Sequence, residues 1–276
     1  MIAAAVRSGL ILVFLAVSVT VAQADRQKDI DRLIELLDFE QTIEIMREEG
    51  LRYGGQVAQD MLPGADMESW QAAVSRIYDA QKMLSLISAD FHKELERADL
   101  APMLAYFDTP DGREIIQLEL AGRRAFLDPQ VEQESIAGFN EGTMGDARLQ
   151  DQVAQFIDEG DLVEFNVMGT LNSSMMFYRG LRDGGAMDVT EQDLLTDFWA
   201  QEDDARRNAS EWLGAFLTLA YQPLTPEQLD HYIAFFRTPE GRDLNRAIFA
   251  VFDQMYAEIS YLIGLAVADH MASEPL

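Results

Sequence analysis

The sequence predicts an all-α fold: a helical bundle made of two tandem, diverged copies of a helix-turn-helix unit. Three observations support this prediction. Apolar residues recur at i, i+3 and i+4, the spacing of a helix with one buried face. Alternation of apolar and polar residues, which marks a half-buried strand, is nowhere sustained. A ten-residue segment also occurs twice, at 104–113 and at 233–242.

Length and composition indicate a folded, strongly acidic protein. The chain has 276 residues, 48% of them hydrophobic and 25% charged, which is enough for one large or two ordinary domains with real cores. Acidic residues outnumber basic ones by 48 to 21, and the formal net charge of −27 repels nucleic acid and anionic lipid headgroups. We therefore expect no nucleic-acid partner. Cysteine is absent, which excludes disulfides, thiolate metal sites, cysteine nucleophiles and lipoprotein attachment.

The N-terminus has the organisation of a cleavable signal peptide over residues 1–24. Arg7 precedes an uncharged apolar run, and a small-x-small sequence predicts cleavage after Ala24. An uncleaved membrane anchor is the alternative, but a spanning helix needs roughly 20 apolar residues. The later apolar stretch at 259–268 is too short to cross a bilayer and is expected to be a buried helix segment. We expect a periplasmic or secreted protein with no stable membrane insertion after cleavage.

The repeated segment divides the rest of the chain. LAYFDTPDGR and IAFFRTPEGR are identical at six of ten positions. We therefore predict a first helical repeat over 25–136, a glycine-rich linker over 137–149, and a second helical repeat over 150–276. Two further landmarks keep the same order and nearly the same offset, namely Trp70 with Trp199 and GLRYGG at 50–55 with GLRDGG at 180–185.

Each repeat is expected to contain a tight corner between two helices. An aromatic pair ends the first helix, a threonine caps the second, and a proline opens it. Thr225 is expected to form a capping box at the start of another helix, and Thr190 marks a weaker helix start. Residues 244–266 are expected to form a long amphipathic helix. The corner residues are Phe107, Thr109, Pro110 and Gly112 in the first repeat and Phe236, Thr238, Pro239 and Gly241 in the second.

The stretch from Leu224 to about His270 resembles a bacterial exported family known as domain of unknown function 2059. That family's signature is an acidic helix followed by an aromatic residue, Ser or Thr, Pro, any residue and Gly. Both corners match it, although the resemblance covers mainly the C-terminal third, with a weaker echo at 70–127. The resemblance implies an exported helical protein and brings no catalytic residues with it.

Signals for chemistry are weak along the whole sequence. Gly54-Gly55 and Gly184-Gly185 lack the spacing of a phosphate-binding loop and are expected to be turns. His231 follows Glu227 by one helical turn, but a single pair of this kind is typical of a solvated surface contact. His92 and His270 stand alone. We predict no catalytic, cofactor-binding or metal-binding residues.

Arg113 and Arg242 occupy the same position in the two repeated corner segments. Each lies in the first turn of its helix beside free backbone N–H groups, an arrangement that can hold an anion or contact a partner. We favour the alternative, in which each arginine ties its corner to a carboxylate or carbonyl of the preceding helix. The corner aromatics, with Trp70 and Trp199, are expected to anchor the core.

We expect a non-enzymatic binding or interaction module whose partner is another envelope protein or envelope component. One alternative is a hydrolase that acts on an envelope polymer with a pair of carboxylates. The other is a carrier of small apolar ligands. Convergent polar side chains in a deep cleft would favour the hydrolase, and an apolar cavity would favour the carrier. An exposed apolar patch would favour the interaction module.

Overall fold

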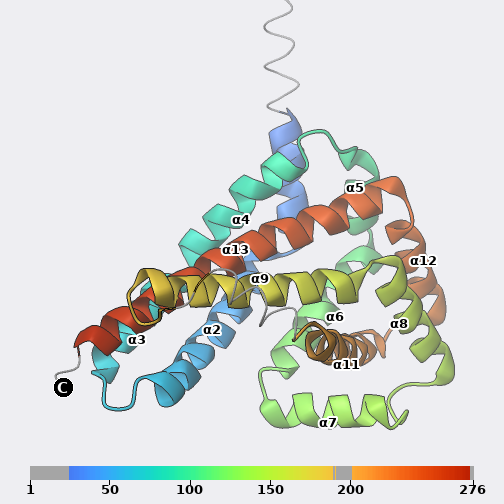
Figure 1. The fold of residues 1–276 in the computed structure, drawn as a ribbon. Coiled ribbons are helices and arrows are strands. Elements are labelled where there is room, and N and C mark those ends of the chain that lie inside the picture. Colours follow the sequence, from blue (N-terminus) through green and yellow to red (C-terminus); the bar gives the residue numbers. More distant parts are fainter. Residues whose placement is uncertain (1–24, 189, 191–200, 274–276) are drawn as a thin grey trace, which may run out of the picture.

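A computed structural model describes residues 25–188, 190 and 201–273 of the chain. Of the described residues, 83% are helical and none lies in a strand, which confirms the all-α prediction (Figure 1). The predicted signal peptide, Trp199 and the helix expected after Thr190 lie outside the described residues. Residues 25–36 form the first helix, and the others are α2 (Phe39–Met61), α3 (Met67–Ile77), α4 (Ala80–Glu94), α5 (Leu100–Phe107), α6 (Pro110–Ala125), α7 (Pro129–Asn140), α8 (Ala147–Glu159), α9 (Leu162–Asp183), α11 (Glu202–Tyr221), α12 (Pro226–Phe236) and α13 (Pro239–Ser273).

Short polar side chains start most of these helices. Asp66, Asp79 and Asp99 cap α3, α4 and α5, and in each case the carboxylate accepts a backbone N–H of the first turn. Asp128 and Asp146 do the same for α7 and α8. Part of the acidic excess therefore consists of helix caps. The helix dipole also favours a carboxylate at these positions.

The threonine caps predicted from the sequence are confirmed. Thr225 forms a complete capping box with Gln228 at the start of α12. The hydroxyl of Thr109 accepts from the backbone N–H of Gly112 at 3.0 Å, and Pro110 opens α6. These starts leave few unpaired N–H groups in the first turns.

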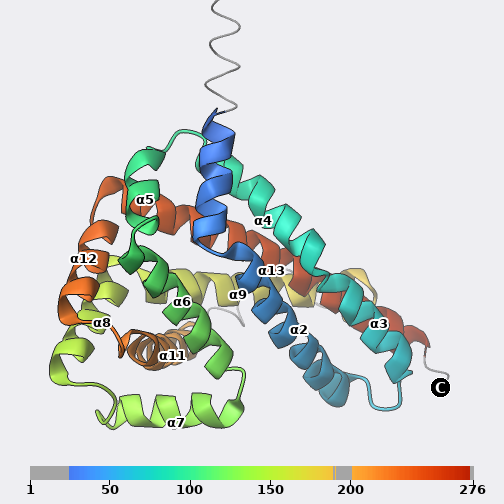
Figure 2. The same ribbon diagram turned by 180° about the vertical axis from the view of Figure 1, so that it is seen from behind.

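Two long helices, α9 and α13, form the central pair of the molecule. They lie side by side and run in the same direction (Figures 1 and 2). A Cβ at Gly180 would lie 2.3 Å from the carbonyl oxygen of Tyr261, and one at Gly264 would lie 2.1 Å from that of Phe177. The two glycines therefore allow backbone to pack directly on backbone.

The length of α13 corrects one expectation about membranes. The apolar stretch at 259–268 belongs to a helix of 35 residues, and Pro239–Ala272 is long and apolar enough to cross a bilayer. By itself this is a weak indication, because the core helix of a soluble protein passes the same test. In this fold one face of α13 is buried from Leu244 to Val267, and 28% of its most apolar 18-residue window is buried.

The two halves of the chain are interlocked. From the second half, α11 packs on α6 and α7, and α13 packs on α3, α4 and α5. One continuous apolar core contains residues of both halves. The predicted linker is helical up to Asn140 in α7 and continues as a short connection to α8, in which Gly142 and Gly145 have positive φ. The internal duplication stays a prediction.

The expectation that both glycine runs are turns is right for one run and wrong for the other. Gly184 ends α9, and Gly185 follows it with a φ of 83°. Gly54 and Gly55 instead lie inside α2. A Cβ at Gly54 would lie 2.6 Å from Cγ1 of Val74, so this glycine lets α2 approach α3 closely.

Candidate functional site

The two predicted corners have the same local geometry. The hydroxyl of Thr109 donates to the carbonyl of Tyr106 at 2.7 Å, and that of Thr238 donates to the carbonyl of Phe235 at 2.7 Å. Thr238 also accepts from the backbone N–H of Gly241 at 3.0 Å, as Thr109 does from its own glycine. Each threonine therefore closes the preceding helix and starts the next one.

A side chain is excluded at both corner glycines. A Cβ at Gly112 would lie 2.4 Å from the carbonyl oxygen of Tyr106, and one at Gly241 would lie 2.2 Å from that of Phe235. The obstacle is backbone in both cases, so it cannot move aside as a side chain could. The glycine in the Thr-Pro-acid-Gly pattern is thus explained by packing.

The corners meet each other through their aromatic residues. Tyr106 stacks on Phe235 with ring centroids 4.7 Å apart, and Phe107 contacts Phe235 edge-on at 5.5 Å. Phe107 and Phe236 are buried. The corner aromatics are therefore core residues, and Trp70 is also buried, with its indole N–H donating to the carbonyl of Gly54 at 2.8 Å.

Arg113 and Arg242 occupy equivalent exposed positions on α6 and α13. Arg113 forms an ion pair with Asp108 of its own corner, and Arg32 bonds the same carboxylate at 3.1 Å. These guanidinium groups hold the pKa of Asp108 below its usual value, Arg113 by the larger effect. Among the described residues, Arg242 forms no ion pair. Binding of an anion or partner at either arginine stays a prediction.

The histidines occupy three different settings. Nε2 of His92 lies 2.9 Å from a carboxylate oxygen of Asp31. Nδ1 of His270 donates to the carbonyl of Ala266 at 2.8 Å, while His231 is exposed on α12. In the described part of the chain, no three His, Asp or Glu side chains are grouped to hold a metal ion.

Glu227 does not act as a ligand partner of His231. Its carboxylate lies 3.5 Å from the guanidinium of Arg148, which also contacts Asp230 at 3.2 Å. All three side chains are at least half exposed. This arrangement is the solvated surface contact that the sequence suggested.

The most developed candidate site is a cavity of about 870 Å³ between α2, α6, α9, α11 and α13. These helices surround the middle of the molecule in both views (Figures 1 and 2). Each contributes one face at helical spacing, which explains why the amphipathic pattern of the sequence did not reveal a cavity. On α9, for example, the wall is formed by Phe165, Gly169, Ser173 and Phe177.

The cavity wall is mainly aromatic and aliphatic. Phe165 of α9 stacks on Phe249 of α13 at 4.5 Å, and Phe39 of α2 contacts Phe252 edge-on at 5.5 Å. From α11, Trp212 adds its ring to the wall. Such a lining favours the apolar part of a ligand, because apolar surface leaves water on binding.

An ion pair joins three of the lining helices. The guanidinium of Arg123 on α6 contacts both carboxylate oxygens of Glu49 on α2, at 3.0 and 2.9 Å. It also donates to the hydroxyl of Tyr256 on α13 at 3.1 Å. This two-bond geometry satisfies both charges within the protein, so the pair serves to hold the wall together.

A second carboxylate in the wall belongs to Glu119 on α6. Its oxygen accepts hydrogen bonds from the hydroxyls of Tyr221 at 2.6 Å and Tyr232 at 3.0 Å. Burial raises the pKa of Glu119, and the two hydroxyl donors oppose that rise. Burial also raises the pKa of both tyrosines well above its usual value, so they remain donors.

The third acidic group of the cavity is Asp253 on α13. One of its oxygens accepts from the side-chain amide of Asn172 on α9 at 3.1 Å. The other, Oδ1, is buried and has no hydrogen-bond partner among the described residues. Gly169 lies opposite, where a Cβ would be 3.3 Å from this oxygen.

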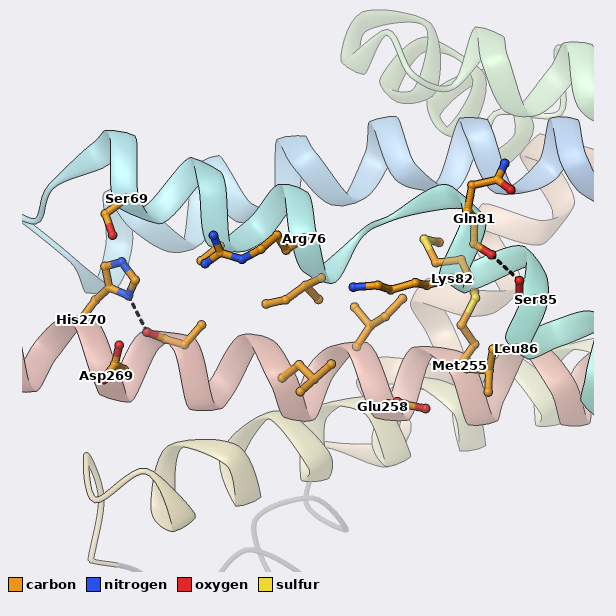
Figure 3. Close-up of a pocket in the computed structure, with 16 residues that line it drawn as sticks. Ser69, Arg76, Gln81, Lys82, Ser85, Leu86, Met255, Glu258, Asp269 and His270 are labelled. Carbon is orange, nitrogen blue, oxygen red and sulfur yellow. Dashed lines mark hydrogen bonds between the residues drawn. The ribbon is translucent and has the colours of Figure 1, made fainter.

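A second hollow lies on another side of α13, between that helix and α3 and α4 (Figure 3). Its floor is apolar and includes Met255 and Ile259, while Arg76 and Lys82 extend over it from the other side. His270 lies at one end and points back to its own helix. The polar groups of this groove do not converge, so the central cavity is the stronger candidate site.

Sequence reasoning missed the cavity residues. Glu119 and Asp253 are two among 48 acidic residues, and their partners lie more than 80 positions away along the chain. Comparison of the chain with models of known families, with curated proteins and with solved structures finds no match. The family resemblance of the corners therefore stays a prediction.

Proposed function

We propose that this protein is exported and acts as a non-enzymatic binding protein for a small, mainly apolar ligand. The observation that supports this proposal is the central cavity of about 870 Å³ with its aromatic wall. Ligand sites in proteins are typically about 300–1,000 Å³, mostly apolar, with a few polar groups that orient the ligand. Of the three classes that the sequence left open, the carrier fits this geometry best.

The polar groups of the cavity favour binding over hydrolysis. A hydrolase of the expected kind needs two carboxylates free to act on one bond. Here Glu49 is held by Arg123, and Glu119 is held by two tyrosine hydroxyls. Asp253 keeps one buried carboxylate oxygen without a partner among the described residues.

The corners favour a structural role over an interaction surface. Their aromatic residues face each other inside the core, and Phe107 and Phe236 are buried. The corners therefore position α6 and α13, two helices that line the cavity. Changes at the corners are expected to affect binding through folding.

Binding of an uncharged probe tests the proposal directly. We expect 1-decanol, below its solubility limit, to bind the chain starting at Asp25 in isothermal titration calorimetry. Ser173→Phe places a large ring in the cavity wall and should abolish this binding. Met168→Phe is the matched control, because Met168 is on the same helix but exposed. Equal binding by both variants, or no binding by the parent chain, would overturn the proposal.

Export is tested separately by intact mass. The small residues before Asp25 predict that the periplasmic product begins at Asp25. We therefore expect the mass of residues 25–276 after expression in a bacterium with its native leader. A periplasmic product that retains Met1 would show that the segment is an anchor.

A further inference from the structure

We infer that the ligand of the central cavity is an organic cation, an apolar body that carries an ammonium group, and that Asp253 is its anionic contact. This inference rests on the proposed function and specifies its ligand class. Charge balance, the geometry of Asp253 and the aromatic wall each support it.

The charges of the cavity do not balance without a cation. Four charged side chains line it: Glu49, Glu119, Arg123 and Asp253. The single guanidinium is engaged by both oxygens of Glu49, so that pair is neutral. Glu119 and Asp253 form no ion pair within the described residues, and because burial favours the protonated form of Glu119, Asp253 carries the charge that is left unbalanced. An anionic ligand would add a like charge close to this carboxylate, which is unfavourable.

Asp253 has an oxygen that is ready to accept a hydrogen bond. Its Oδ2 accepts from Asn172 at 3.1 Å, whereas Oδ1 is buried without a partner in the described structure. A buried acceptor that lacks a hydrogen bond is costly. Gly169 lies close beside Oδ1, since a Cβ there would be only 3.3 Å from this oxygen. The N–H of an ammonium group that displaces this contact would satisfy the oxygen and neutralise its charge.

The cavity that Asp253 lines is rich in aromatic rings. Eleven of the side chains that line the cavity are aromatic. On α13, Phe249 lies one turn before Asp253 and Tyr256 lies almost one turn after it, and both line the cavity. Ring faces carry negative electrostatic potential and attract ammonium groups within about 6 Å. The same rings accommodate an alkyl or aryl body, so one wall suits both parts of the ligand.

The charge of the whole chain acts in the same direction. A net charge of −27 raises the local concentration of cations and lowers that of anions near the protein. This effect is general and decreases with salt. It can therefore be separated from a specific contact by a substitution that changes the net charge elsewhere.

Three probes that share the same alkyl chain test the inference. Decylammonium, 1-decanol and decanoate differ only in the charge of the head group, and each is titrated below its micellar concentration at pH 7. We expect decylammonium to bind about tenfold more tightly than decanol, since one charge-assisted hydrogen bond contributes that much. Decanoate should bind more weakly than decanol. If decanol binds and decylammonium binds no more tightly, the inference is wrong and the proposed function stands.

A pair of variants locates the cation contact. Asp253→Asn keeps the shape of the side chain and should remove most of the preference for decylammonium, with little change for decanol. Asp243→Asn on the same helix removes an equal charge from an ion pair with Arg246 and should leave the preference intact. Equal losses in the two variants would overturn the role of Asp253. If neither decanol nor decylammonium binds the parent chain, the proposed function fails as well.

Discussion

A single carboxylate, that of Glu119, shows how its surroundings decide what an acidic residue does. It lies between two buried tyrosines, and burial raises its pKa although both hydroxyls donate to it. The folded protein therefore holds this proton over a pH range in which the unfolded chain has lost it. The stabilisation that follows is fully present below the unfolded pKa of about 4.3, and it is lost as pH rises through the folded pKa.

Glu119→Gln is expected to remove this pH dependence. The amide keeps an oxygen for the tyrosine hydroxyls but carries no charge. Relative to the parent chain, the variant should gain stability as pH rises above about 4.3 and reach a plateau above the folded pKa. Urea unfolding from pH 4 to pH 8 measures the difference. Glu114→Gln, exposed on the same helix, corrects for loss of a negative charge. A difference that grows toward low pH would contradict the expectation.

The corner threonine gives a second prediction for one residue. Thr238 accepts from Gly241 N at 3.0 Å and donates to Phe235 O at 2.7 Å, so its hydroxyl serves two helices. Thr238→Ala should lower the free energy of unfolding by about 1 kcal/mol, the usual effect of losing such a cap. Thr238→Ser retains the hydroxyl and should recover most of this loss in the same urea titration. Equal losses in the two variants would show that the methyl group, and not the cap, is responsible.

Individual residues also show what the sequence could and could not predict. Thr109 and Thr238 were predictable because a cap acts within three residues. Asp253 was not, because its importance depends on Asn172, 81 positions earlier, and on a buried oxygen. The aspartate caps were equally predictable, because Asp66 and Asp99 directly precede apolar helical patterns.

The packing of whole helices depends on glycines at close contacts, and one of them, Gly54, was expected to lie in a turn. In α2, Gly54 lies where α3 approaches, and in α9, Gly180 lies against the backbone of α13. The error at Gly54-Gly55 arose because glycine disfavours an isolated helix, whereas a close contact between helices offsets that preference. The apolar spacing of α13 was predicted correctly. The helices that pack on α13 could not be predicted from that spacing.

Gly180→Ala tests the contact between α9 and α13. The new Cβ would lie 2.3 Å from the carbonyl oxygen of Tyr261, so the helices must separate. We expect a loss of about 1–3 kcal/mol in the free energy of unfolding, as is typical of overpacking. Gly55→Ala is the matched control, since a Cβ there meets nothing within 4 Å inside α2. That variant should gain about 0.5–1 kcal/mol from higher helix propensity.

Gly180→Ala should also affect the cavity. Asn172 of α9 bonds Asp253 of α13 across this interface. If the helices separate, that bond lengthens and the decylammonium affinity should fall together with stability. Unchanged stability in Gly180→Ala would contradict the close packing of the two helices.

At the scale of the whole molecule, the interlocked halves predict a single cooperative unit. The helices of the second half pack on those of the first, and one apolar core extends through both. A protein with two independent repeats would unfold in two steps, one for each repeat. Because neither half here has a separate core, removing contacts in one half destabilises the other.

Calorimetry tests this cooperativity. We expect the chain starting at Asp25 to unfold in one transition whose calorimetric and van't Hoff enthalpies agree. Leu33→Ala near the N-terminus and Leu229→Ala in α12 each remove a fully buried side chain and should each cost about 2–5 kcal/mol. Both should lower the midpoint of the same transition. Two transitions, with each variant shifting only one, would show that the halves fold independently. The cavity would then lie between separable units, and ligand binding should sharpen the two transitions into one, because a ligand that binds only the assembled halves stabilises them together.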